Sequence, residues 1–172
     1  MGDTHHTEPH IVVIGPMGAG KSTLGRLLAD ALACDFLDSD DWLEELHGES
    51  GSAIAATHGL ASLHAIELEI FDAMASMSAR AVIAPAESVV DTVVGRDLLS
   101  SQVTIWVDAT PDALMERRMA TDHRRAMSDA ELIERREARA DALRHCSSIR
   151  IDTTAASPQV CLAAALEAVG QG

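Results

Sequence analysis

Apolar residues gather in five short runs along the chain. The runs are His10 to Ile14, Phe36-Leu37, Ala81 to Ala84, Val103 to Val107 and Ile149 to Ile151, of which the last is the weakest. Short continuous apolar runs that end in turn residues are typical of strands buried on both faces of a sheet. We therefore expect each run to be a strand.

The segments between the runs predict helices, because their apolar residues recur three or four positions apart. The expected helices are Lys21 to Leu32, Ala61 to Ser78, Ala113 to Ala120, Asp129 to His145 and Val160 to Val169. Strands that alternate with helices form a parallel sheet covered by helices on both faces. The pattern therefore predicts an α/β fold.

No repeat or linker divides the chain of 172 residues, which is long enough to bury one core. We expect a flexible N-terminal arm at residues 1–9 and a single domain at residues 10–172. His5, His6 and His10 lie in the polar N-terminal segment, and we expect them to be solvated side chains rather than metal ligands.

Composition narrows the functional classes. Aromatic residues make up 2% of the chain and Tyr is absent, which does not suit base stacking, and the net charge of −14 repels nucleic acid and anionic membranes. No stretch reaches the roughly 20 apolar residues of a membrane span, and the N-terminus has no signal-peptide pattern. Cys34, Cys146 and Cys161 have no metal-ligand spacing. We expect a cytoplasmic monomer with reduced thiols and no nucleic-acid or membrane partner.

The segment from Gly15 to Ser22 matches the phosphate-loop motif G-x-x-x-x-G-K-[ST] at every required position. It lies between a predicted strand and a predicted helix, where backbone N–H groups converge on phosphate oxygens. Lys21, the only Lys of the chain, would reach the β- and γ-phosphates of ATP, and the Ser22 hydroxyl would bind Mg²⁺. The other nucleotide-binding candidates are Gly18, Ala19, Gly20 and Thr23.

An acidic cluster, Asp38-Ser39-Asp40-Asp41, follows the second run, at the end of a strand where α/β proteins bind ligands. One carboxylate there would hold Mg²⁺ through water, and another would accept a proton from an attacking hydroxyl. Asp38 or Asp40 could also cap a helix at Trp42 to His47. The two interpretations can apply to different members of the cluster.

The motifs together resemble the shikimate kinase family over nearly the whole chain. The phosphate loop includes the family's Met-Gly pair at Met17-Gly18 and its trailing Gly25, and Phe36 to Asp40 is similar to its F-x-D-x-D. Glu67 stands where the family has a Glu. The resemblance implies a three-layer P-loop fold with a five-stranded parallel sheet of nucleoside-monophosphate-kinase topology, and phosphoryl transfer from ATP to shikimate.

The resemblance also implies roles for individual residues. Asp40 would contact the acceptor hydroxyl, and Asp38 would lie near Mg²⁺. Arg117 would lie on the adenine side, and Arg124 would stabilise the transferred group from a lid at about 117–128. Arg139 would bind the acceptor, although an arginine in such a charge-rich helix can instead pair with acidic residues four positions away on a solvated face.

Two departures from the family affect the acceptor site. Leu63-His64 replaces a Phe-Arg pair whose Arg grips the shikimate carboxylate, and a His offers a weaker contact to a carboxylate. Ala86-Glu87-Ser88 replaces a Gly-Gly-Gly run, so Glu87 would repel an anionic acceptor unless it binds Mg²⁺ or an Arg. The acceptor-binding candidates are therefore Asp40, His64, Glu87 and Arg139.

Three functions remain open at this point. The first is a shikimate kinase with unusual substitutions, and the second is a kinase for another small sugar or sugar acid such as gluconate. The third is a nucleotide-binding paralogue with little or no phosphotransfer activity. Fold-level analogy alone does not decide among them.

Overall fold

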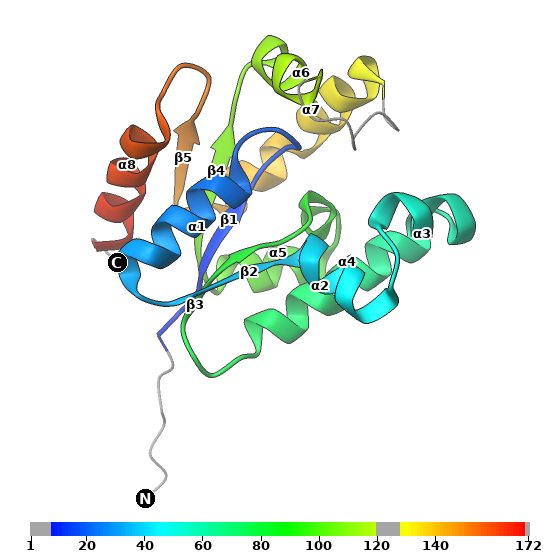
Figure 1. The fold of residues 1–172 in the computed structure, drawn as a ribbon, viewed down its shortest axis with the longest axis horizontal. Helices are drawn as coiled ribbons and strands as arrows, with labels where there is room; N and C mark the ends of the chain where they lie inside the picture. The colour runs from blue at the N-terminus through cyan, green and yellow to red at the C-terminus, as the bar shows by residue number, and fades with distance from the viewer. Residues whose placement is uncertain (1–7, 120–127, 171–172) are drawn as a thin grey trace, which may run out of the picture.

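Five strands form one parallel sheet in the order β2-β3-β1-β4-β5 (Figure 1). The computed structural model describes residues 8–119 and 128–170, apart from the side chain of Arg118. The strands are β1 (Ile11–Ile14), β2 (Asp35–Asp38), β3 (Ala81–Ala84), β4 (Val103–Asp108) and β5 (Ile149–Asp152). All five predicted strands are confirmed, with ends that differ by at most one residue.

The central strand shows why the runs are continuously apolar. All four residues of β1 are fully buried. Because successive side chains of a strand point to opposite faces, Ile11 and Val13 join one apolar cluster, and Val12 and Ile14 join the other. Both faces of the sheet are thus covered, as the sequence predicts.

Helices form the outer two layers. The helices α1 (Lys21–Leu32) and α8 (Pro158–Gly170) pack on the face of Ile11 and Val13. The opposite face carries most of the remaining helices, and it supports the acceptor side of the site described below. The other helices are α2 (Ser39–His47), α3 (Gly51–His58), α4 (Leu60–Ala75), η1 (Glu87–Asp91, a 3₁₀ helix), α5 (Val93–Ser100), α6 (Pro111–Met119) and α7 (Asp129–Cys146).

Some elements differ from the sequence-based expectation. The helix after β2 begins at Ser39, three residues before the expected Trp42. Three short elements, α3, η1 and α5, were not predicted. Helix α3 is rich in small residues and lacks a distinct apolar stripe, while α5 begins with two β-branched valines and contains Gly95, all of which weaken a helical pattern.

His10 corrects one prediction. It is 4% exposed rather than solvated. Its Nδ1 accepts a hydrogen bond from the Ala81 backbone N–H at 3.1 Å, and its Nε2 lies 3.1 Å from the Met77 carbonyl oxygen. The residue is buried because it enters β1 beside the start of β3. His5 and His6 lie outside the described residues, as do 120–127 of the expected lid.

In the described ranges, no helix combines the length and the apolar character that crossing a bilayer requires.

Candidate functional site

The phosphate loop connects the end of β1 to the first residue of α1. Gly18 and Gly20 have φ angles of +85° and +95°, a backbone conformation that favours glycine. Gly20 is the N-cap of α1 and carries no side chain that would cap the helix, and the first turn contains no acidic residue. The loop thus leaves the positive end of the helix dipole available to an anion.

Lys21 folds back over this loop. Its Nζ donates to the Gly15 carbonyl oxygen at 2.9 Å and lies 3.5 Å from the Pro16 carbonyl oxygen. The ammonium is therefore held at the loop rather than in solvent. The contact of Lys21 with phosphate stays a prediction.

Ser22 and Asp38 meet beside the loop. The Ser22 hydroxyl donates to Asp38 Oδ2 at 2.7 Å, while Asp38 Oδ1 accepts from the Asp40 backbone N–H at 3.1 Å. Asp38 is therefore the N-cap of α2, which confirms one of the two interpretations of the acidic cluster. A hydroxyl and a carboxylate oxygen side by side also fit Mg²⁺ when phosphate oxygens and water complete the coordination. No three His, Cys, Asp or Glu side chains of 8–119 and 128–170 group into a metal site by themselves.

Arg117 joins the loop to the segment after β5. Its guanidinium donates to the Gly18 carbonyl at 3.3 Å, to Thr153 Oγ1 at 3.0 Å and to the Thr153 carbonyl at 2.5 Å. The Thr153 hydroxyl in turn donates to the Ala19 carbonyl at 2.9 Å. Thr153 was missed as a site residue, although its place directly after the last strand was a usable signal.

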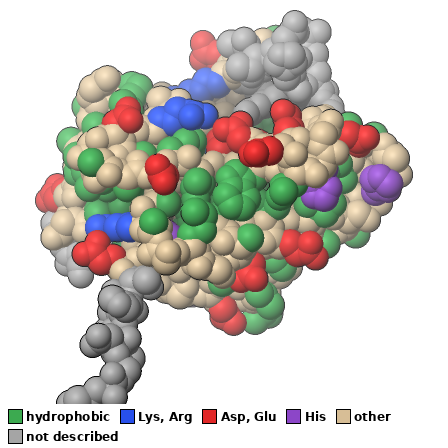
Figure 2. All heavy atoms as spheres, turned by 60° about the horizontal axis from the view of Figure 1, so that its bottom comes forward, with side chains coloured by type: hydrophobic (Ala, Val, Ile, Leu, Met, Phe, Trp, Pro, Cys, Tyr) green, Lys and Arg blue, Asp and Glu red, His purple; other side chains and the backbone are tan. Residues whose placement is uncertain are grey.

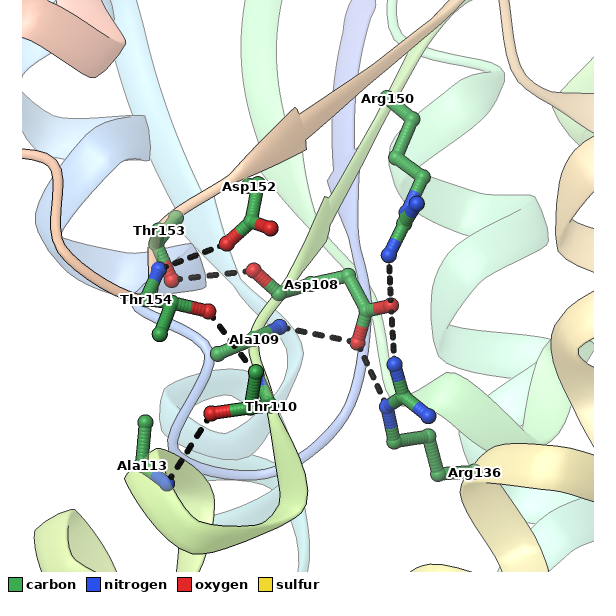
Figure 3. A network of polar contacts seen from close by, with 9 residues as sticks. All are labelled: Asp108, Ala109, Thr110, Ala113, Arg136, Arg150, Asp152, Thr153 and Thr154. Atoms are coloured by element: carbon green, nitrogen blue, oxygen red, sulfur yellow. Dashed lines mark hydrogen bonds and ion pairs between the residues drawn. The ribbon is translucent and has the colours of Figure 1, made fainter.

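A buried carboxylate fixes α7 beside the sheet (Figure 3). Asp108 ends β4 with no exposed surface, and Arg136 of α7 binds both of its oxygens, at 2.8 and 2.7 Å. Arg150 adds a third contact at 2.8 Å, and the Ala109 backbone N–H donates to the same carboxylate at 2.9 Å. This network sets the position of α7 and hence of Arg139 one turn further on.

Arg139 binds two carboxylates of η1. Its Nε and one terminal nitrogen donate to Asp91 at 2.8 and 2.6 Å, and the other terminal nitrogen donates to Glu87 Oε2 at 3.1 Å. The Arg139 side chain is 11% exposed. Pairing four residues apart on a solvated face is therefore the wrong interpretation, because both partners belong to another element.

Glu87 is buried between charged groups. Burial raises its pKa, while the nearby charges of Lys21 and Arg139 lower it in part. Its second oxygen, Oε1, is buried and accepts no hydrogen bond from the described residues. The structure thus brings Glu87 to an Arg, one of the two partners that the sequence analysis required for it.

His64 and Glu67 of α4 complete this region. Burial lowers the pKa of His64, and the charge of Arg139 lowers it further, so the imidazole is neutral near pH 7. Burial also raises the pKa of Glu67, whose carboxylate accepts a hydrogen bond from the Ser88 hydroxyl and lies within the electrostatic influence of Asp40. Asp91 and Ser88 were missed as site residues, and Arg124 lies outside the described residues.

Comparison with known proteins gives a consistent result. A family model described as shikimate kinase matches residues 17–169. The shikimate kinase of Corynebacterium diphtheriae is 31% identical over 159 residues, which cover 88% of each chain.

Solved structures share the fold. A shikimate kinase from Acinetobacter baumannii in complex with shikimate has a TM-score of 0.83 at 24% identity, with 96% of this chain and 93% of that chain covered. A gluconokinase from Sinorhizobium meliloti has a TM-score of 0.65 at 19% identity, with 96% and 93% covered. Both likenesses concern the fold alone, and they agree with the three-layer P-loop architecture.

Proposed function

The protein belongs to the shikimate kinase family and is an ATP-dependent small-molecule kinase, and on this basis we propose that it transfers the γ-phosphoryl group of Mg·ATP to a hydroxyl of shikimate. The observation that carries the proposal is the phosphate loop, where the Lys21 ammonium lies 2.9 Å from the Gly15 carbonyl and Ser22 contacts Asp38 at 2.7 Å. We expect the enzyme to act as a monomer in the cytoplasm.

The phosphate side would work by electrostatic positioning. The N–H groups of Gly18 to Ser22 bind phosphate oxygens, and Lys21 stabilises the charge that spreads over the transferred group. Ser22 and Asp38 would hold Mg²⁺, which neutralises phosphate charge when bound. Arg117 supports the loop from the adenine side, and Arg124 would approach the phosphates from the lid.

The acceptor side would orient one hydroxyl. Asp40, the second residue of α2, would accept its hydrogen bond and then its proton, and the Asp38 cap supports this role by fixing the start of that helix. His64 and Arg139 would face the acceptor's carboxylate. Both residues would bind that carboxylate weakly, because His64 is neutral and Arg139 already binds Glu87 and Asp91.

That weakness favours a second candidate, a kinase for a neutral sugar or polyol. Such an acceptor needs no free guanidinium, and its hydroxyls can donate to the carboxylates of the site. A nucleotide-binding protein with little phosphotransfer remains an outcome of the same experiment.

The test is a phosphotransfer assay with Mg·ATP against shikimate, gluconate and a panel of neutral polyols. We expect product with shikimate. Transfer to a polyol and not to shikimate would replace the first proposal by the second. Binding of ATP without transfer to any acceptor would overturn both.

A further inference from the structure

The guanidinium of Arg139 is occupied by the protein's own carboxylates. Asp91 takes the edge that contains Nε, at 2.8 and 2.6 Å, and Glu87 takes the remaining terminal nitrogen at 3.1 Å. Paired N–H donors on one edge of a guanidinium are the geometry by which arginine binds a carboxylate ligand. An anionic ligand that uses Arg139 must therefore compete with groups already bound.

The surroundings favour the internal pair over such a ligand. Only 12% of the Glu87 side chain and 11% of the Arg139 side chain are exposed, so solvent screens their attraction weakly. Burial and the charge of Arg139 lower the pKa of His64, so this side chain adds no positive charge near pH 7. A ligand carboxylate entering here would meet Glu87 and Asp91 as like charges.

We propose that Glu87 is a specificity-determining residue: its carboxylate occupies Arg139 as an anionic acceptor would, and so lowers the site's affinity for acceptors that carry a carboxylate. The inference rests on the proposed function, since it concerns the acceptor site of that kinase. Glu87 belongs to η1, and Arg139 lies 52 positions later on α7, so the contact is made by the fold and not by local sequence.

Glu87 differs from Asp91 in two ways. Its side chain is 12% exposed and binds one terminal nitrogen of Arg139, whereas the Asp91 side chain is 40% exposed and binds the edge that contains Nε. Its Oε1 is also a buried acceptor without a hydrogen bond from the described residues. Because this oxygen is shielded from solvent, Glu87 acts on acceptors through its charge, and it disfavours those that are anionic.

The test compares shikimate with its methyl ester, which has the same ring and hydroxyls but no charge. Wild-type protein, E87Q and E87A are titrated calorimetrically with each compound in the presence of Mg·ADP, and KM is measured with Mg·ATP. We expect E87Q and E87A to bind shikimate about tenfold more tightly than wild type, because a contact to a charged group becomes available. Binding of the methyl ester should not improve.

The matched control is D141N, which removes a carboxylate from the same helix as Arg139. Asp141 pairs with Arg144 on the surface, and its side chain is 85% exposed. The variant should leave both affinities and KM values unchanged. A gain in D141N equal to that in E87Q would attribute the effect to general charge and overturn the proposal.

A measurement on wild-type protein guards against variants that fail to fold. The proposal expects the methyl ester to bind at least as tightly as shikimate. Tenfold tighter binding of shikimate by wild type, or no gain in a folded E87Q that still binds Mg·ADP, would overturn it. If wild type does not phosphorylate shikimate and E87Q does, the role of Glu87 stands and the proposed function falls. If wild type phosphorylates shikimate at low KM and E87Q gains nothing, the proposed function stands and the role of Glu87 falls.

Discussion

Lys21 is the single ammonium in a chain whose other twelve basic residues are all Arg. Its Nζ is held at the phosphate loop by the Gly15 carbonyl. A compact, strongly hydrated charge on a flexible stem suits a group that must move from this carbonyl to a phosphate oxygen, whereas a planar guanidinium suits fixed bidentate contacts. The residue type is therefore informative as well as the motif.

We expect K21A to lower kcat at least about 100-fold, the range for removal of one electrostatic stabiliser of the transition state. K21R should recover little of this loss, because its fork does not fit a site shaped for a point charge. The measurement is steady-state phosphotransfer, with thermal unfolding as the check on folding. Turnover within a factor of a few of wild type in folded K21A would contradict the assignment of Lys21.

Glu67 makes stability depend on pH. Burial raises its pKa in the folded state above the ordinary value of 4.5. Such a group contributes stability that is fully present below the unfolded pKa and is lost as pH rises through the folded pKa. We expect the free energy of unfolding of wild type to fall relative to E67Q from about pH 4.5 upward, as measured by urea denaturation at several pH values. A difference that is constant over pH 4–7 would contradict this expectation.

The two halves of the site were not equally predictable. The phosphate side rests on eight consecutive residues, so roles for Lys21 and Ser22 could be proposed from the sequence. The acceptor side depends on long-range contacts, since Arg139 meets Asp91 across 48 positions. Nothing local to Arg139 marks Asp91 as its partner, and the sequence analysis therefore gave Arg139 an incorrect alternative.

At the scale of elements, α7 is held to the sheet by the buried carboxylate of Asp108. The sequence predicted this helix and its span to within one residue, but not the contact that orients it. Strands β1, β3 and β4 were predictable because their residues are buried on both faces, whereas β2 and β5 gave shorter apolar runs beside charged residues. Helices α3 and α5 were missed because each has eight residues and is stabilised by packing rather than by its own pattern.

We expect R136M to lower the free energy of unfolding by about 3 kcal/mol, because it leaves a fully buried carboxylate with fewer partners. R150M removes a contact to one of the same Asp108 oxygens, but the Arg150 side chain is 49% exposed. This substitution should therefore lower the free energy of unfolding by only about 1 kcal/mol, including the loss of the stacking of Arg150 on Trp106. Urea denaturation of both variants gives the comparison. Equal losses would show that burial does not govern the strength of this network.

Gly95 of α5 packs against the backbone of η1 too closely to leave room for a side chain. A Cβ added at Gly95 would lie 1.9 Å from the Val89 carbonyl oxygen, which is backbone and cannot rotate away. We expect G95A to lower the free energy of unfolding by about 2 kcal/mol through overpacking. G51A is the matched control, since its Cβ would meet Leu63 at 3.5 Å and alanine favours a helix, so no loss is expected in urea denaturation. A G95A variant as stable as wild type would contradict the packing described here.

At the scale of the whole molecule, the outer surface and the site differ in charge. Figure 2 shows acidic side chains spread over one face, with basic side chains at only a few places. The net charge is −14, yet Lys21 and Arg117 both lie at the phosphate loop. Local cations can thus bind phosphate inside a molecule that repels polyanions at longer range.

This charge distribution predicts how stability responds to salt. A net charge of −14 repels itself in the compact state, and salt shortens the range of that repulsion from about 30 Å at 0.01 M to about 8 Å at 0.15 M. We expect Tm to rise by about 2–4 °C over this interval, which corresponds to about 1 kcal/mol for a chain of this size. Exposed pairs such as Arg26 and Asp41, at 3.6 Å, weaken in salt but contribute little. K21A separates screening from anion binding at the loop. An equal rise of Tm with salt in K21A would attribute the rise to screening. A Tm that falls with salt in both proteins would show that surface ion pairs outweigh the repulsion.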